Sequence, residues 1–277
     1  MNKAEIKIYM PSYSRPRKRY YEVYVKYLLN FFNQLGAEVH CDTRIDSDGR
    51  FVMGVNGRRV FMDYSDHPAI SKLWDRKIPY FKFHCHQKFI HTNKIFPFPP
   101  ISFYDWGQFR RLQKSIQYRA IGDVIVNKQK PYGNALKRRK LVRSTLRKKY
   151  GKNVDIKPDS PQLTFWNRIK DCLVAVFVPG AYNNMLDRGH FQYIGFGCCT
   201  ISPRIDDLLS FNKLLIPGTH YILCKDDYSD LIEVIEWCKS HRTDCIHIGQ
   251  NAKALFNKTS VPSMTWKWMQ HVISKTS

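Results

Sequence analysis

Apolar and polar residues alternate with two different periods in the first part of the chain. Residues 6–10 (IKIYM) alternate as in a β-strand. Through residues 20–35 apolar residues recur at helical spacing, and this pattern stops at Gly36. Residues 37–41 (AEVHC) then have the pattern of a strand again. The order of strand, helix, glycine and strand predicts a βαβ unit and therefore a parallel pair of strands.

The next segment has the pattern of antiparallel strands. Residues 50–67 contain two alternating stretches joined by Asn56-Gly57, a dipeptide typical of tight hairpin turns. A further strand is expected at 78–84. The proline-rich segment 95–103 is expected to form an ordered loop or a sheet edge, because proline cannot donate a hydrogen bond to a neighbouring strand.

The strand and helix pattern starts again near residue 121. The predicted elements are a strand at 122–128, a helix at 135–151, a short strand at 153–156, a helix at 160–171 and a strand at 172–180, followed by a strand at 220–226, a helix at 227–241 and two further helices. We therefore expect an α/β protein with two Rossmann-like, doubly wound domains facing a cleft. Their expected bounds are 1–120 and 121–277, with a linker at 105–121.

The charge of the chain indicates an anionic partner. Lys and Arg number 45 and Asp and Glu 23, which gives a net charge of +22. Nucleic acid, an acidic membrane surface or a phosphorylated ligand would each suit this charge. Basic residues gather near the amino terminus and in 128–149, which has no acidic residue. The candidate nucleic-acid-binding residues are Arg15, Arg17, Lys18, Arg19, Arg139 and Lys140.

The cysteines and the hydropathy pattern indicate a reducing compartment. The eight cysteines form no CxxC pair, so we expect free thiols and a cytoplasmic location, in a bacterial or virus-infected cell among others. The first residues lack the apolar core of a signal peptide. No stretch of about 18 uncharged apolar residues occurs, so no membrane span is expected.

Residues 176–197, VFVPGAYNNMLDRGHFQYIGFG, have the pattern of a ligand site at the end of a strand. The strand ends at Pro179-Gly180 and a helix is expected to begin near Asp187, with Arg188 in its first turn. A cation is unfavourable there because the helix dipole is positive at that end, and a bound anion would relieve the conflict. The alternative is a surface arginine whose stem packs on a neighbouring helix.

This segment, together with IPGTHYILCKDDYSDLIEVIEWC and the two helices after it, resembles the carboxyl-terminal donor domain of GT-B glycosyltransferases. The resemblance covers 122–274 and is greatest to the group-1-like and lipopolysaccharide-modifying branches. It implies a nucleotide-sugar donor, with a UDP-sugar expected first and no tightly bound metal. The residues that it assigns to the donor are Lys130, Arg138, Gly180, Arg188 and Gln192. Arg188 would contact the diphosphate, and Gln192 stands where retaining relatives have a glutamate that binds the ribose.

A general base is expected in the amino-terminal half, across the cleft from the donor. Residues 62–67 (MDYSDH) offer Asp63, Asp66 and His67 at the end of a predicted strand. Asp66 is our first candidate and His67 the second, and the alternative is ordinary turn chemistry.

Two further residue patterns of the same half offer candidate chemistry. His84 and His86 are further base candidates, since their spacing offers no complete set of zinc ligands. Asp46-Ser47-Asp48 precedes a glycine and a hairpin, so it predicts a turn rather than a metal site.

These observations favour a nucleotide-sugar-dependent glycosyltransferase. The excess of basic residues is best explained by an acceptor hydroxyl on DNA, such as a 5-hydroxymethylpyrimidine, as in the phage DNA-base glycosyltransferases that share the GT-B fold. A membrane-associated glycolipid or a polysaccharide is the competing acceptor, with peripheral contact to anionic headgroups. From another class of function, a non-catalytic nucleic-acid-binding protein on a transferase scaffold stays open.

Overall fold

The structure is a computed structural model of the 277-residue chain. It describes residues 6–11, 28–42, 50–65, 69–99, 105–117, 124–125, 135–151, 154–155, 161–180 and 184–276. The chain divides into two compact units. Unit 1 consists of residues 1–104, 208–213 and 259–277, and unit 2 of residues 105–207 and 214–258.

Unit 1 contains a six-stranded sheet in the order β2-β1-β3-β4-β5-β6. Its strands are β1 (Lys7–Pro11), β2 (Glu38–Asp42), β3 (Arg50–Val55), β4 (Arg58–Asp63), β5 (Tyr80–Lys82) and β6 (Ile95–Pro97). β1 is parallel to β2, and β4, β5 and β6 are parallel to one another. β3 is antiparallel to both of its neighbours, so the sheet is mixed.

The turn chemistry of unit 1 agrees with the sequence. Asn56 and Gly57 join β3 to β4 with positive φ angles of 49° and 78°, as a two-residue hairpin turn requires. Residues 100–103 of the proline-rich segment lie outside the described residues, and Ile95–Pro97 form β6, which lies at the edge of the sheet, where a missing N–H has the least consequence. Both predictions are confirmed.

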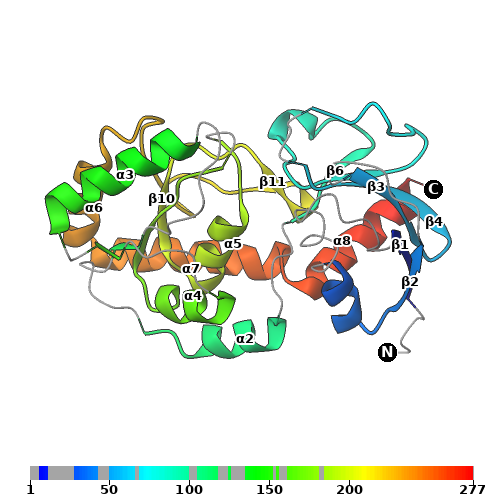
Figure 1. The fold of residues 1–277 in the computed structure, drawn as a ribbon, viewed down its shortest axis with the longest axis horizontal. Helices are drawn as coiled ribbons and strands as arrows, with labels where there is room; N and C mark the ends of the chain where they lie inside the picture. The colour runs from blue at the N-terminus through cyan, green and yellow to red at the C-terminus, as the bar shows by residue number, and fades with distance from the viewer. Residues whose placement is uncertain are drawn as a thin grey trace. The chain divides into compact units, whose positions relative to one another are not determined.

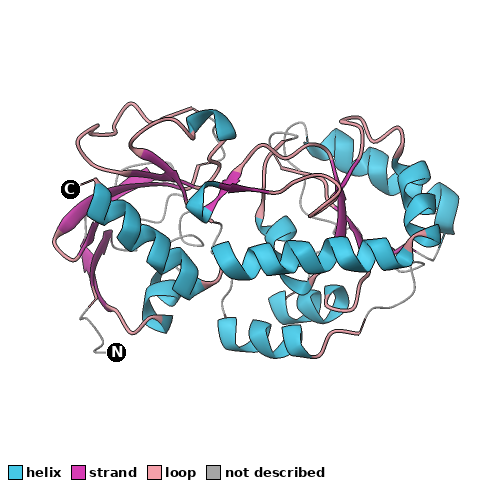
Figure 2. Ribbon diagram, turned by 180° about the vertical axis from the view of Figure 1, so that it is seen from behind, coloured by secondary structure: helices cyan, strands magenta, loops and turns pink. Residues whose placement is uncertain are grey.

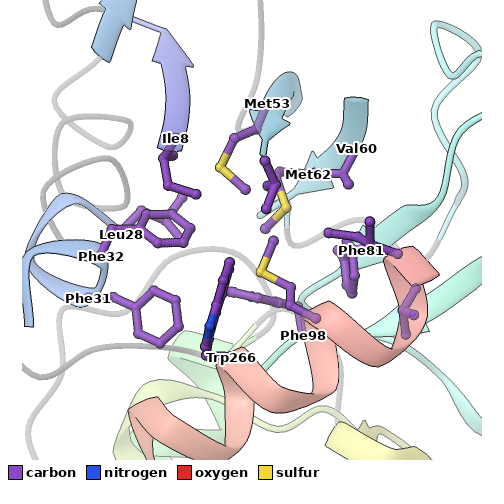
Figure 3. Packing of buried hydrophobic residues seen from close by; sticks show 14 of the residues in the cluster. Ile8, Leu28, Phe31, Phe32, Met53, Val60, Met62, Phe81, Phe98 and Trp266 are labelled. Atoms are coloured by element: carbon purple, nitrogen blue, oxygen red, sulfur yellow. The ribbon is translucent and has the colours of Figure 1, made fainter. Parts of the chain in front are cut away.

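The core of unit 1 includes a helix from the far end of the chain. The helical residues 28–34 and α8 (Pro262–Lys275) pack against the sheet. Figure 3 shows Trp266 of α8 among Phe31, Phe32 and Met62. We expected this last helix to belong to the second domain. Trp268 Nε1 instead donates to the Pro97 carbonyl at 2.9 Å, inside unit 1.

Unit 2 has a five-stranded sheet in which every pair is parallel, in the order β13-β10-β9-β7-β8. Its strands are β7 (Val124–Ile125), β8 (Val154–Asp155), β9 (Val174–Val176), β10 (Cys199–Ser202) and β13 (Ile222–Leu223). Helices lie on both sides of this sheet (Figure 2). The doubly wound α/β architecture that the sequence predicted is thereby confirmed.

The helices of unit 2 are α2 (Trp106–Lys114), α3 (Ala135–Tyr150), α4 (Gln162–Ile169), α5 (Arg188–Phe196), α6 (Leu231–Ser240) and α7 (Arg242–Thr259). α3 and α6 run side by side (Figure 1), and the Tyr150 hydroxyl donates to Glu236 at 2.8 Å. The predicted linker at 105–121 is wrong for its first part. That part forms α2, whose Phe109 is buried against Trp166 and Phe196 within unit 2.

The remaining short elements are η1 (Gln87–Phe89) in unit 1 and the segment of β11 (Leu208–Leu209), η3 (Ser210–Asn212) and β12 (Lys213–Leu214). β11 and β12 form a separate two-stranded sheet. Among the described residues, the helices are all too short or too polar to cross a lipid bilayer.

The close approach of α7 to the turn after α5 depends on a glycine. A Cβ added at Gly249 would lie 2.0 Å from the carbonyl oxygen of Gly197, a backbone atom. Gly197 itself ends α5 in the left-handed conformation, with φ 78°, so the turn has little freedom to move.

Gly249→Ala is expected to destabilise unit 2 by about 3 kcal/mol, because the methyl group forces α7 away from the turn. Urea unfolding measures the change. Gln250→Ala, at the exposed neighbouring position of the same helix, is the control and should change stability by less than about 0.5 kcal/mol. Equal effects of the two substitutions would contradict the packing argument.

His190 of α5 is a buried neutral histidine. Its ring stacks on Phe177, and Nε2 lies 3.1 Å from Thr200 Oγ1. Burial lowers the pKa of His190 to about 3. The unfolded chain binds a proton at this residue below about pH 6.5 and the folded chain does not. The contribution of neutral His190 to the free energy of unfolding is therefore complete above about pH 6.5, and it decreases as the pH falls below that value.

Between pH 7 and pH 5, His190 is expected to reduce the free energy of unfolding by about 2 kcal/mol. His190→Gln can keep a hydrogen bond to Thr200 and does not titrate, so this part of the pH dependence should disappear. Chemical denaturation of both proteins at the two pH values measures the difference. The same pH dependence in the variant would show that other groups cause it.

Candidate functional site

The strand order of unit 2 places the expected ligand site between β7 and β9. β7 is the first strand of this unit, and it has the second strand, β8, on one side and the third, β9, on the other. The connections leave β7 in opposite directions at such a point, which opens a crevice at the carboxyl ends of the strands. The residues that follow β9, Phe177–Gly180, are described. Those that follow β7 include Lys130 and lie outside the described residues.

Two arginines of α3 hold the backbone at the end of β9. Arg138 Nη2 donates to the Gly180 carbonyl at 2.8 Å and lies 3.4 Å from that of Pro179. Arg139 donates to the Val178 carbonyl from Nε at 3.3 Å and from Nη2 at 3.2 Å. The predicted donor residues Arg138 and Gly180 are thus in direct contact.

Arg138 keeps an unused donor at this point. Its Nε is buried and has no hydrogen-bond partner within the part of the chain that the structure describes. Burial lowers the pKa of Arg138. Tyr228 acts in the opposite direction, and the positive charge of the adjacent Arg139 lowers the pKa of Arg138 further. A guanidinium stays protonated at neutral pH. An anion at the end of β9 would therefore satisfy a buried N–H of a protonated arginine.

Arg139 is not on the surface that we predicted for nucleic acid. Its side chain is 4% exposed, and Nη2 lies 3.8 Å from Asp187 Oδ2. The prediction is wrong for this residue, because α3 turns position 139 toward the sheet along with Ala135, Val142 and Leu146. The adjacent Lys140 is exposed.

The carboxylate of Asp187, the residue before α5, caps the amino terminus of that helix. Asp187 Oδ1 accepts hydrogen bonds from the backbone N–H groups of Gly189 at 2.7 Å and His190 at 3.2 Å. Two of the free N–H groups at this end of the helix are thus bonded by Asp187, so no bound anion is needed to explain an arginine at this position. Arg188 begins α5 and is partly buried. Its proposed contact with a diphosphate stays a prediction.

Gln192 lies in the interior of unit 2 and is 8% exposed. Its Oε1 accepts from Trp166 Nε1 at 2.6 Å, and its Nε2 donates to the Arg188 carbonyl at 3.0 Å. The amide therefore connects α4 to α5 and uses its acceptor and one of its donors in doing so. A ribose would have to compete with these bonds.

Sequence reasoning missed Tyr228, in the loop between β13 and α6. The residue is 3% exposed and its hydroxyl donates to the Phe177 carbonyl at 3.1 Å. Its φ angle is 60°, an unfavourable conformation for a bulky side chain and one that is often found near functional sites. Burial raises the pKa of Tyr228. The positive φ at a tyrosine has no signal in the sequence pattern.

In unit 1, Asp63 ends β4 in a buried ionic network. Its carboxylate lies 3.0 Å from Lys82 Nζ and accepts hydrogen bonds from the Tyr80 hydroxyl and from the N–H and hydroxyl of Ser65. Burial alone would raise the pKa of Asp63, but Lys82 and these hydrogen bonds hold it below its usual value. Asp63 is therefore a structural anion rather than a free base.

The remaining predicted residues fall into two groups, those that lie outside the described residues and two histidines that the structure describes. Asp66, His67, Arg15, Arg17, Lys18 and Arg19 lie outside the described residues. His84 is buried, and His86 Nδ1 accepts from the Lys88 N–H at 3.1 Å, which caps η1. No group of His, Cys, Asp and Glu side chains within the described ranges is arranged to hold a metal ion.

Comparison with known proteins relates the chain to one viral sequence and to several solved structures. No protein family's sequence profile matches it. Uncharacterized protein 179R of Invertebrate iridescent virus 6 is 35% identical over 89 residues. The match covers 30% of this chain and 8% of 179R, so the chain spans less than a tenth of that protein's length.

Two solved structures match nearly the whole chain. HepE (Alr3699) of Anabaena, in complex with UDP, matches 96% of this chain and 99% of its own, with a TM-score of 0.50 and 9% identity. A glycosyltransferase from Rickettsia africae ESF-5 matches 96% of this chain and 84% of its own, also with a TM-score of 0.50 and 9% identity. At this identity the likeness is one of fold, and the chain has the two-part α/β fold of GT-B glycosyltransferases, as its sequence predicted.

Proposed function

We propose that the chain is a nucleotide-sugar-dependent glycosyltransferase whose donor binds in unit 2, at the carboxyl end of β9. The observation that carries this proposal is Arg138, a half-buried guanidinium with an unused N–H at the point where the sheet order reverses. The HepE structure with the same fold holds UDP, which supports a UDP-sugar as the donor. Arg188 and Lys130 are proposed as further contacts to the diphosphate.

The arrangement suits departure of a nucleoside diphosphate. Negative charge builds up on the terminal phosphate as the bond to the sugar breaks, and a fixed cation stabilises that charge. Arg138 is fixed because Nη2 is bonded to Gly180 and α3 supplies its backbone. Its reorganisation during the reaction would therefore be small. Asp66, with His67 as the second candidate, is proposed as the base that accepts the proton of the acceptor hydroxyl.

For the acceptor we propose DNA that carries a hydroxymethylated pyrimidine. The support is the net charge of +22 and the outer face of α3, where Lys137, Lys140, Arg147, Lys148 and Lys149 are exposed. The seven cysteines whose side chains are described are buried and form no disulfide with one another, which suits a reducing compartment, and we propose the cytoplasm. A glycolipid or polysaccharide acceptor is the alternative that the acceptor assay below decides.

Arg138→Ala is expected to weaken UDP binding by about 10- to 100-fold, since a charge-assisted hydrogen bond contributes about 1.5–3 kcal/mol. Isothermal titration with UDP and UDP-glucose measures the change. Lys140→Ala, two residues further along α3 and exposed, should leave UDP binding unchanged. If both variants bind UDP as the parent does, the donor site lies elsewhere.

The acceptor is tested by incubating the protein with UDP-glucose and DNA, with and without 5-hydroxymethylcytosine, and analysing the nucleosides by mass spectrometry. A hexose adduct on the modified nucleoside alone is expected. Lys137→Glu combined with Lys140→Glu should lower DNA affinity and its salt dependence while UDP affinity stays constant.

Labelling of a lipid or polysaccharide, with DNA unmodified, would contradict the DNA acceptor. Salt-sensitive DNA binding without affinity for any nucleotide sugar would contradict the enzyme and favour a non-catalytic binding protein.

A further inference from the structure

Unit 2 has a second hollow that the donor proposal does not use. Two pockets of 510 Å³ and 490 Å³ lie along β13, α6 and α7. They share the lining residues Ile222 and Trp237, so they are neighbouring parts of one groove, which we call the β13 groove. Its size is that of a site for a ligand or a short peptide.

The walls of the β13 groove carry exposed apolar side chains. Trp237 of α6 is 38% exposed and Leu223 of β13 is 46% exposed, and both line the first pocket. Ile248 of α7 lines the same pocket. Large apolar side chains exposed side by side in a concave surface are typical of interaction sites. A tryptophan between two pockets is typical of an energetic hot spot.

One wall of the β13 groove is β13 itself, the last strand in the order of the unit 2 sheet. β13 pairs with β10 on one side and ends the strand order on the other. An edge strand of this kind can pair with an extended segment of another chain.

The charge at the β13 groove is opposite to that of the protein as a whole. Asp230, Glu233 and Asp244 line the two pockets, with Lys225 as the one lysine and His247 as the one histidine among the described lining residues. In a chain with a net charge of +22, this acidic lining is unfavourable for nucleic acid and for anionic membrane surfaces. It is favourable for a cationic partner.

We propose that the β13 groove binds an extended, cationic and apolar segment of a partner protein. Apolar side chains of the segment would pack on Trp237, Leu223 and Ile248, and its Lys or Arg side chains would pair with Glu233 and Asp244. An arginine or lysine beside the indole of Trp237 would also gain a cation–π contact. None of the lining residues is a proposed donor contact, and the proposal does not depend on the proposed enzyme activity.

The test uses a dye-labelled peptide, Lys-Leu-Lys-Val-Lys-Leu, titrated with the full-length protein in 150 mM NaCl and followed by fluorescence anisotropy. A dissociation constant below about 100 μM is expected. A peptide with glutamate in place of lysine and one with serine in place of leucine and valine should each bind at least about tenfold more weakly.

Two variants locate the binding. Trp237→Ala and Glu233→Lys should each weaken binding of the peptide by at least about tenfold. Leu141→Ala, another exposed apolar position, and Glu38→Lys, the same charge change in unit 1, are the matched controls and should have no effect. Circular dichroism confirms that all four variants are folded.

The proposal is overturned if the acidic peptide binds as well as the basic one, if no binding occurs, or if Trp237→Ala and Leu141→Ala behave alike. Sedimentation of the protein without peptide supplies one further outcome. A dimer that Trp237→Ala dissociates would show that a second copy of the chain, rather than a partner protein, occupies the groove.

Discussion

The candidate site depends on the hydrogen bonds between α3 and the backbone that follows β9. Arg138 and Arg139 bond to the carbonyls of Val178 and Gly180 and so fix the backbone where the strand order reverses. Tyr228 adds a third contact, to Phe177. Three elements distant in sequence thereby meet at one strand end. The Nε of Arg138 stays buried there without a hydrogen-bond partner among the described residues.

The glutamine at position 192 has a structural explanation. The residue must accept a hydrogen bond from Trp166 and donate one to the Arg188 carbonyl. A carboxylate could accept the first bond but could not donate the second, and burial would add a desolvation cost. The glutamine at this position thus follows from the packing of α4 on α5.

Local patterns predicted the elements, whereas contacts between distant segments could not be predicted. Asn56-Gly57 specified its hairpin because positive φ is a local requirement. A helix was expected at the end of the chain and assigned to the second domain, but its sequence pattern does not say which sheet it covers, and α8 packs in unit 1. In α3, the basic run 137–140 looks uniform, yet the helical period buries Arg139 and exposes Lys140. The spacing from Ala135 to Val142 was the signal that could have revealed this difference.

The central claim is that the donor phosphate binds at Arg138. The most direct measurement is the ¹H–¹⁵N resonance of the Arg138 side-chain Nε, assigned by its loss in Arg138→Lys and followed during titration with UDP. A saturable shift of this resonance is expected, with the backbone amides of Phe177 and Gly180 shifting at the same UDP concentrations. Saturable UDP binding that leaves these resonances unchanged would contradict the claim.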